Sequence, residues 1–228
     1  MFKQFFEPLS STYTYLVGCD KTKQAVLIDP VASEVDAYIA ELQASGYTLV
    51  YTMETHVHAD HVTGADLLRQ KLGSKSVVHR DAGAMCGDLL VTDGVHIIVG
   101  TLDFEVRHTP GHTNGCVSYV CGDKVFTGDA LLIDGCGRTD FQMGDAGQLY
   151  DSIHQKVFTL PDDTKVYPGH DYHGNFYSTV GHERLHNQRL GGGRSREDFI
   201  ALMAELKLAY PKQIDVALPA NQACGRVS

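Results

Sequence analysis

The stretch Thr55-His56-Val57-His58-Ala59-Asp60-His61 decides the fold, because four of its seven side chains are of metal-binding types. It follows a strand-like run. Residues one and three of an extended or tightly turned segment can point at one place, so His56 and His58 can approach the same ion. Asp60 and His61 begin the next apolar-periodic segment, where Asp60 can cap a helix. The stretch therefore predicts one side of a metal site at the end of a strand.

Three further candidate ligands also follow strand-like runs. His112 stands in the turn at 109–113, Asp129 follows Gly128 at the end of a β-rich run, and His170 closes the tripeptide at 168–170. Loops at strand ends carry function and meet at one edge of a scaffold. Imidazole and carboxylate groups are ligands that suit zinc or iron. The sequence predicts a metal site built from His56, His58, Asp60, His61, His112, Asp129 and His170.

The rest of the pattern mixes strands and helices without a regular alternation. Residues 12–17 and 25–29 predict a hairpin, and a helix opened by Ser33, with Asp36 as a weak capping partner, is expected to end at Gly46. This order favours two sheets with helices outside over one doubly wound sheet. Further strands are expected near 49–53, 77, 96–99, 104–107, 117–121, 124–127 and 165–167, and further helices over 62–72, over 148–158 and after Ser195.

Bulk composition indicates a globular protein. The chain has 228 residues, 43% of them hydrophobic, and a formal net charge of −9. We expect a single domain over 1–228 with a helical appendage at about 194–228. The negative charge and the absence of a basic stripe argue against nucleic acid as a partner. No apolar run is long enough to span a membrane, and residues 1–8 resemble neither a secretory signal nor a transit peptide, so we expect a cytoplasmic location.

The cysteine spacing predicts free thiols. The six cysteines form no CxxC pair, and their spacing suits neither a zinc finger nor a disulfide framework. Buried or loosely exposed thiols in a reducing compartment are therefore expected. They are Cys19, Cys86, Cys116, Cys121, Cys136 and Cys224.

Four motifs resemble the signature set of the metallo-β-lactamase superfamily: THVHADH at 55–61, TPGHT at 109–113, GD at 128–129 and PGH at 168–170. They are similar to it in order and spacing over residues 12 to about 175. The resemblance implies an α+β fold, a four-layer αββα sandwich with the metal site at the edge between the two sheets.

Three other segments are similar to the persulfide dioxygenases, the ethylmalonic-encephalopathy-type branch of that superfamily. They are GCGRTDFQ at 135–142, HDYHG at 170–174 and PANQACG at 219–225. This resemblance implies oxidation of glutathione persulfide by O₂ and water to sulfite and glutathione, in hydrogen sulfide detoxification, by a possible homodimer. It also implies one Fe(II) per subunit held by His56, His112 and Asp129, with His58, Asp60, His61 and His170 around these ligands.

The same segments suggest residues for substrate binding. Arg138 can offer a two-pronged donor to one glutathione carboxylate, or it forms an ion pair between loops. Tyr172 can donate a hydroxyl hydrogen bond, or it packs. Arg226 is a candidate for the second carboxylate, or a frayed terminal charge, and Thr113 can steady the preceding ligand. Cys136, in the same loop, is expected to pack rather than to act as a nucleophile.

Two rival functions stay open on the sequence. A glyoxalase II-like dinuclear hydrolase of glutathione thioesters would use the same seven ligands, with a second metal on Asp60, His61 and His170. The chain after His170 is short for the helical appendage of such enzymes. A catalytically idle module that senses persulfides is the other alternative. So dense a set of polar side chains is costly to keep without a metal, which argues against it.

Overall fold

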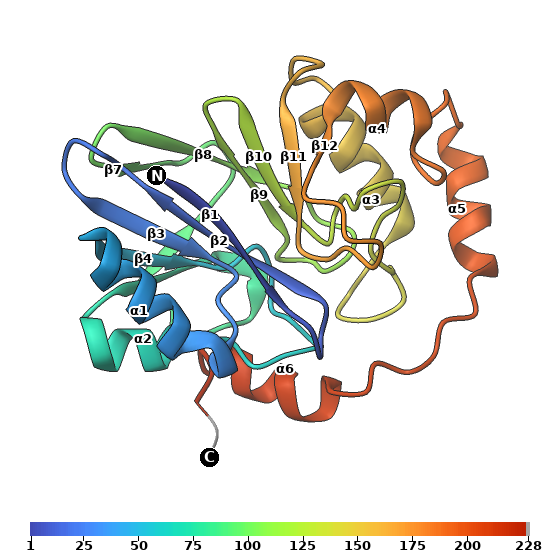
Figure 1. Cartoon of the computed structure of the whole chain (residues 1–228). Coiled ribbons are helices and arrows are strands. Elements are labelled where there is room, and N and C mark those ends of the chain that lie inside the picture. Colours follow the sequence, from blue (N-terminus) through green and yellow to red (C-terminus); the bar gives the residue numbers. More distant parts are fainter. Residues whose placement is uncertain (227–228) are drawn as a thin grey trace.

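The structure, a computed structural model, describes residues 1–226, and within them the strands form two six-stranded sheets (Figure 1). In the first sheet β1, β2 and β3 are antiparallel and β3 to β6 are parallel; in the second, only β10 and β11 are parallel. The first sheet contains β1 (Phe2–Glu7), β2 (Thr12–Gly18), β3 (Gln24–Ile28), β4 (Thr48–Met53), β5 (Lys75–His79) and β6 (Leu89–Val91). The second contains β7 (His96–Val99), β8 (Leu102–His108), β9 (Val117–Cys121), β10 (Lys124–Gly128), β11 (Lys165–Pro168) and β12 (Ser178–Thr179).

Helices cover the outer face of each sheet. In Figure 1, α1 and α2 lie outside the first sheet, α3, α4 and α5 lie outside the second, and α6 lies across one end of the sandwich. Three short helical turns, η1 (Ala32–Glu34), η2 (Arg80–Ala82) and η3 (Ile153–Val157), join or extend these elements. The helices are α1 (Val35–Ser45), α2 (Ala65–Leu72), α3 (Ala146–Ser152), α4 (Val180–His186), α5 (Arg196–Glu205) and α6 (Ile214–Gln222).

Three apolar clusters hold these layers together. The central one lies between the sheets and includes Tyr15, Phe104 and Phe126. A second packs α1 and α2 on the first sheet through side chains such as Tyr38. A third packs α3 and α5 on the second sheet around Phe199. Each layer is thus apolar on the side that meets the next, and the predicted four-layer αββα sandwich is confirmed.

Helix starts differ from the predictions in two places. The first predicted helix begins with the turn η1, and the N-cap of α1 is Glu34 rather than Ser33, without a side-chain cap bond. Its predicted end is confirmed, since Gly46 adopts the left-handed conformation there. The second helix starts only at Ala65, after the N-cap Gly64. Asp60 is therefore not a helix cap, because its carboxylate bonds to Thr12 and His61 instead.

The prediction that all the cysteines are free thiols is wrong for two of them. Cys86 and Cys224 form a disulfide between positions 138 residues apart. Spacing along the chain could not reveal it, because α6 returns to the first sheet only in the folded structure. The remaining cysteines are buried and free: Cys19, Cys116, Cys121 and Cys136.

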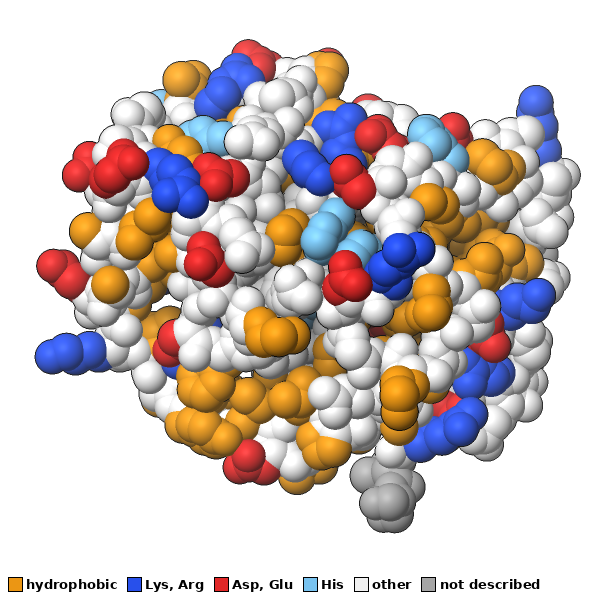
Figure 2. Space-filling view, turned by 180° about the vertical axis from the view of Figure 1, so that it is seen from behind, with side chains coloured by type: hydrophobic (Ala, Val, Ile, Leu, Met, Phe, Trp, Pro, Cys, Tyr) orange, Lys and Arg blue, Asp and Glu red, His pale blue; other side chains and the backbone are white. Residues whose placement is uncertain are grey.

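The surface shows no concentration of one charge sign on the face drawn in Figure 2. Acidic and basic side chains are interspersed there, and apolar side chains gather toward the lower part of the view. Within residues 1–226, no helix combines the length and the apolar character that crossing a membrane requires.

Candidate metal centre

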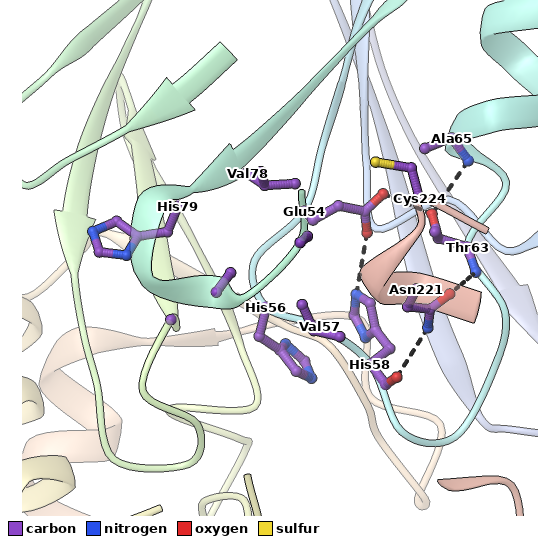
Figure 3. Close-up of a pocket in the computed structure, with 13 residues that line it drawn as sticks. Glu54, His56, Val57, His58, Thr63, Ala65, Val78, His79, Asn221 and Cys224 are labelled. Carbon is purple, nitrogen blue, oxygen red and sulfur yellow. Dashed lines mark hydrogen bonds and ion pairs between the residues drawn. The ribbon is translucent and has the colours of Figure 1, made fainter. Parts of the chain in front are cut away.

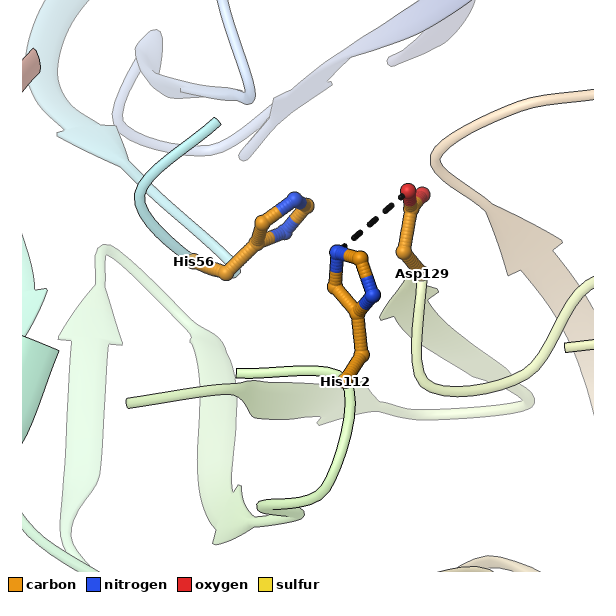
Figure 4. A group of neighbouring side chains, drawn as sticks. All are labelled: His56, His112 and Asp129. Carbon is orange, nitrogen blue, oxygen red and sulfur yellow. Dashed lines mark ion pairs between the residues drawn. The ribbon is translucent and has the colours of Figure 1, made fainter. Parts of the chain in front are cut away.

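Three predicted ligands meet at the edge between the sheets. His56 follows β4, His112 follows β8 and Asp129 follows β10, so each is delivered by the end of a different strand. One ligand atom from each lies within 4.8 Å of the others, and the side chains point toward one another in Figure 4. The His112 Nε2 to Asp129 Oδ2 distance is 3.7 Å. This spacing lets the three donors share one ion.

The imidazole of His56 is oriented by a relay that starts on β3. Asp29, which directly follows that strand and has a φ of +51°, accepts hydrogen bonds from the Thr55 backbone N–H (2.7 Å) and hydroxyl (2.8 Å). Because that hydroxyl is already a donor, its oxygen accepts from His56 Nδ1, 3.0 Å away. Because Nδ1 carries the proton, Nε2 keeps its lone pair free to bind a metal.

A backbone carbonyl sets the tautomer of His112. Its Nδ1 donates to the carbonyl oxygen of Arg138 at 2.6 Å, so Nε2 faces Asp129 unprotonated. The neighbouring Gly137 N–H donates to the Asp129 carbonyl at 2.8 Å. A Cβ at Gly137 would lie 2.8 Å from His112 Nδ1, so only glycine lets the loop pass this closely. The loop at 135–142 thus supports two ligands through its backbone.

The other predicted residues lie beside the three donors. His58, Asp60 and His61 each bring one ligand atom within 4.8 Å of the others. His170 donates through Nδ1 to the Ser11 carbonyl at 3.1 Å. Its Nε2 lies 3.5 Å from both Asp60 Oδ2 and Asp129 Oδ1. The structure therefore brings all seven predicted residues to one place.

His58 is held from below by two carboxylates. Its Nε2 lies 3.1 Å from Asp29 Oδ1 and 3.4 Å from Glu54 Oε2. Burial alone would lower the pKa of His58, but Asp29 and Glu54 hold it well above its usual value. His58 and its two carboxylates thus form a buried charged group beside the site, while its Nδ1 is buried and has no hydrogen-bond partner within residues 1–226.

Burial and neighbouring charges shift the pKa values of His56 and Asp60 toward the forms that bind metals. Burial, together with His58 and His112, lowers the pKa of His56 well below its usual value, so this imidazole is neutral at neutral pH. Burial alone would raise the pKa of Asp60, yet His61 and His170 hold it well below its usual value. A neutral imidazole and an ionised carboxylate are the forms in which these side chains bind metals.

Three buried atoms without a hydrogen-bond partner among the described residues indicate that the site fits a cation: Asp129 Oδ1, His58 Nδ1 and His61 Nε2. Asp129 Oδ1 is buried and has no hydrogen-bond partner within residues 1–226. A buried carboxylate oxygen without a partner is costly, and a metal ion held with His56 and His112 would satisfy it. Two imidazoles and a carboxylate form a donor set that suits Fe(II) or zinc.

A cleft of about 360 Å³ opens beside His170, within the size range of small-molecule sites. Tyr172 lines it and is 70% exposed, its ring parallel to that of His170 at 6.2 Å. Partial loss of water around the hydroxyl in the cleft, together with the nearby carboxylates of Asp129, Asp60 and Asp171, raises the pKa of Tyr172 to about 12, so its hydroxyl stays a donor. Cys136 lies in the wall. Burial raises the pKa of its thiol to about 11, which fits packing and not a nucleophile.

The other substrate-binding candidates have partners within the protein. Arg138 forms a two-pronged ion pair with Asp140 at 2.6 and 2.7 Å. The Thr113 hydroxyl lies 3.1 Å from the sulfur of Cys116. Arg226 is not brought to the cleft, because its guanidinium pairs with Asp66 on α2 at 3.0 Å.

The prediction missed the supporting role of three residues, of which only Thr55 stands inside a quoted motif. Asp29, Glu54 and Thr55 orient the histidines, yet no metal-binding motif contains Asp29, which lies 26 residues before its partner Thr55. Its position directly after an apolar strand was the available signal.

Comparison with known proteins agrees with this geometry. The model of the metallo-beta-lactamase superfamily matches residues 8–170. The human protein named "Persulfide dioxygenase ETHE1, mitochondrial" is 50% identical over 99% of this chain and 89% of its own length. The crystal structure of ETHE1 from Myxococcus xanthus superimposes with a TM-score of 0.97 at 50% identity, covering 99% of this chain and all of the other. A hydroxyacylglutathione hydrolase of Rhodospirillum rubrum is more distant, 35% identical over 72% of this chain and 64% of its own. The chain therefore belongs to the metallo-beta-lactamase superfamily and, within it, to the family of the ETHE1 persulfide dioxygenases.

Proposed function

We propose that this protein is a mononuclear Fe(II)-dependent persulfide dioxygenase. It oxidises glutathione persulfide with O₂ and water to sulfite and glutathione, one molecule of each per turnover, in hydrogen sulfide detoxification. The observation that carries the proposal is the convergence of His56, His112 and Asp129, two of them with a free Nε2 fixed by a bonded Nδ1. The family membership supports the reaction class.

Fe(II) held by this triad would supply the redox chemistry that joins dioxygen to the outer sulfur of the persulfide. The protein's own groups prepare that step. One carboxylate and two neutral imidazoles leave a dipositive ion with one net positive charge, which favours a persulfide anion. Burial alone would lower the pKa of His170, but Asp129 and Asp60 hold it above its usual value. The Nε2 of His170, 3.5 Å from Asp129 Oδ1, is therefore the atom at the edge of the site that is proposed to hold a proton.

The substrate's glutathione part is proposed to lie in the cleft beside His170. Tyr172 offers a hydroxyl donor there. The guanidinium of Arg138 can bind a substrate carboxylate if that carboxylate replaces Asp140, its exposed partner. Thr113 supports the turn that carries His112. The role of Arg226 in substrate binding stays a prediction from the sequence, since its guanidinium is paired with Asp66.

The alternative, a dinuclear hydrolase of glutathione thioesters, would need a second ion on Asp60, His61 and His170. Asp60 accepts from Thr12 at 3.0 Å and lies 3.0 Å from His61 Nδ1, while His61 Nε2 is buried without a hydrogen-bond partner within residues 1–226. What argues against this alternative is the more distant match to the hydroxyacylglutathione hydrolase, at 35% identity over 72% of this chain. Metal analysis of protein purified without oxygen separates the two. About one iron per chain supports the dioxygenase, and two zinc ions support the hydrolase.

Oxygen uptake tests the proposal directly. Protein loaded with Fe(II) under anaerobic conditions is mixed with glutathione persulfide in aerated buffer, and dissolved O₂ and sulfite are followed together. We expect equal amounts of O₂ consumed and sulfite formed, with none in Asp129→Ala. Iron-loaded protein that takes up no O₂ would reject the proposal, and release of a thiol from a glutathione thioester would favour the hydrolase.

Two further expectations belong with this proposal. A cytoplasmic location and a homodimer are predicted from the sequence, whereas the mammalian relatives carry "mitochondrial" in their names. Sedimentation of the iron-loaded protein decides between monomer and dimer.

A further inference from the structure

The motif at 219–225 lies against the metal-binding loop, which we define as residues 55–63. Asn221, on α6, is only 4% exposed. Its Nδ2 donates to the backbone carbonyls of His58 (2.9 Å) and His61 (2.7 Å). Its Oδ1 accepts from the backbone N–H of Thr63 at 2.9 Å. Figure 3 shows this side chain between His58 and Thr63. One amide thus joins three points of the loop.

Contacts on both sides of Asn221 fix its position. The Cys224 carbonyl accepts from the Asp66 N–H at 3.0 Å, and the Gln222 carbonyl accepts from the Met85 N–H at 3.2 Å. Gly225 has a φ of +90°, and a Cβ there would lie 2.1 Å from the Thr63 carbonyl oxygen. The Cys86–Cys224 disulfide adds a covalent tie next to these bonds. The C-terminal segment therefore lies directly on the loop and cannot slide along it.

The loop transmits this restraint to a metal donor. The ring centroids of His61 and His58 are 4.4 Å apart, and those of His58 and His56 are 4.1 Å apart. His58 also bonds to Asp29, the residue that holds Thr55 and, through it, His56. A shift of the turn at 58–61 would therefore move both the ring packed on His56 and the carboxylate that orients it.

We infer that Asn221 is a positioning residue of the metal centre, which fixes the backbone of the turn at 58–63 and thereby the direction of the His56 imidazole. It touches neither the proposed triad nor the cleft. The inference rests on the proposed metal site but not on the identity of the substrate.

Two variants separate the contribution of the Asn221 acceptor from that of its two donor hydrogen bonds. Asn221→Ala removes all three hydrogen bonds, whereas Asn221→Asp keeps the acceptor for Thr63 and loses both donors. We expect both variants to bind Fe(II) about 10-fold to 100-fold more weakly, as for other groups that orient metal ligands. In the apoprotein, the Thr63 amide should exchange faster in Asn221→Ala and near the parent rate in Asn221→Asp. In the loaded enzyme, kcat should fall while KM for the persulfide changes by less than about 2-fold, because the cleft is untouched.

Gln222→Glu is the matched control, since it is also an amide-to-carboxylate change on α6, at an exposed side chain. It should bind Fe(II) as the parent does.

The parent itself gives a readout that requires no variant to fold: binding of cobalt(II) should slow Thr63 amide exchange, since the coupling is reciprocal. Each of three results would overturn the inference. The first is parent-like iron affinity in both Asn221 variants, the second is a loss of affinity in Gln222→Glu as large as theirs, and the third is unchanged Thr63 exchange on cobalt binding. Iron affinity and exchange need no turnover, so the inference can stand if persulfide oxidation fails.

Discussion

At the scale of single residues, Thr55 connects a buried carboxylate to a metal donor. Thr55→Val keeps the shape but removes the hydroxyl that donates to Asp29 and accepts from His56. We expect Fe(II) affinity to fall about 10-fold to 100-fold, the usual loss when a group orienting a metal-binding histidine is removed. Thr55→Ser keeps the hydroxyl and should retain most of the affinity. Competition titration against a chelator measures both, and equal binding by the valine variant would show that the relay is unimportant.

Arg138 has two separable contacts, one through its side chain and one through its backbone. Arg138→Ala removes the guanidinium but leaves the carbonyl that accepts from His112 Nδ1. Iron content should therefore stay near the parent value, while KM for glutathione persulfide rises about 10-fold, as expected for one lost hydrogen bond to a charged group. Steady-state O₂ uptake and iron analysis on the same samples test this. Arg196→Ala, which breaks the pair between Arg196 on α5 and Asp151 on α3, is the control. A loss of iron in Arg138→Ala as large as its loss of substrate binding would indicate a structural role.

His79 makes stability depend on pH. Burial beside His108 lowers its pKa to about 4, and its Nδ1 accepts from the Asp81 N–H at 3.2 Å. In the unfolded chain its pKa is about 6.5. Between these values the unfolded state binds more protons, so stability falls as pH drops from about 6.5 to 4. His79→Gln should flatten the decline of Tm in this window, whereas His186→Gln, at an exposed histidine, should not. Parallel Tm curves for parent and His79→Gln would contradict the assignment.

At the scale of elements, the turn before His112 packs on the start of α3. Gly111 has a φ of +137°, and a Cβ there would lie 2.3 Å from the backbone nitrogen of Leu149. Gly111→Ala should cost about 1–3 kcal/mol in backbone strain alone and displace His112. Gly122, in the β9–β10 hairpin, has a φ of +59°, and among residues 1–226 no atom lies within 4 Å of a Cβ placed there. Gly122→Ala should therefore cost only about 1–2 kcal/mol. Urea unfolding of both variants measures the difference, and a smaller loss at Gly111 would refute the packing argument.

The sequence predicted those elements whose pattern is local. The hairpin of β2 and β3, the strands before each ligand and the Ser195 cap of α5 are confirmed, because alternation, strand ends and capping residues act over a few positions. Five strands and helices were missed: β1, β6, β12, α4 and α6. Residues 1–8 look like an aromatic cluster, yet β1 is strand because it pairs with β2. Pro219 lies inside α6 and hides that helix from the pattern.

The residues of the candidate site likewise fall into those that the sequence predicted and those that it did not. Its histidines and Asp129 stand in motifs that the sequence displays. Their supports, Asp29 and Asn221, act on residues far along the chain, and their roles emerge only when β3 and α6 meet the metal-binding loop.

At the scale of the whole molecule, the disulfide ties the C-terminal segment to the first sheet. Bonds of this kind stabilise by about 2–4 kcal/mol, mainly by restricting the unfolded chain. Dithiothreitol should therefore lower the Tm of the oxidised protein. Cys86→Ser should show the lower Tm with or without the reductant. Cys121→Ser, at a free thiol, should respond to dithiothreitol as the parent does, and a parent Tm that is insensitive to reductant would contradict this prediction.

The same bond closes residues 86–224 into a covalent ring. His112, Asp129 and His170 lie inside that ring and His56 outside it. The connection between α5 and α6 is largely exposed and contains Lys207 and Lys212, both sites for trypsin. A cut there opens the ring without releasing a fragment. The nicked protein should migrate as one species on a denaturing gel without reductant and as two once the disulfide is reduced.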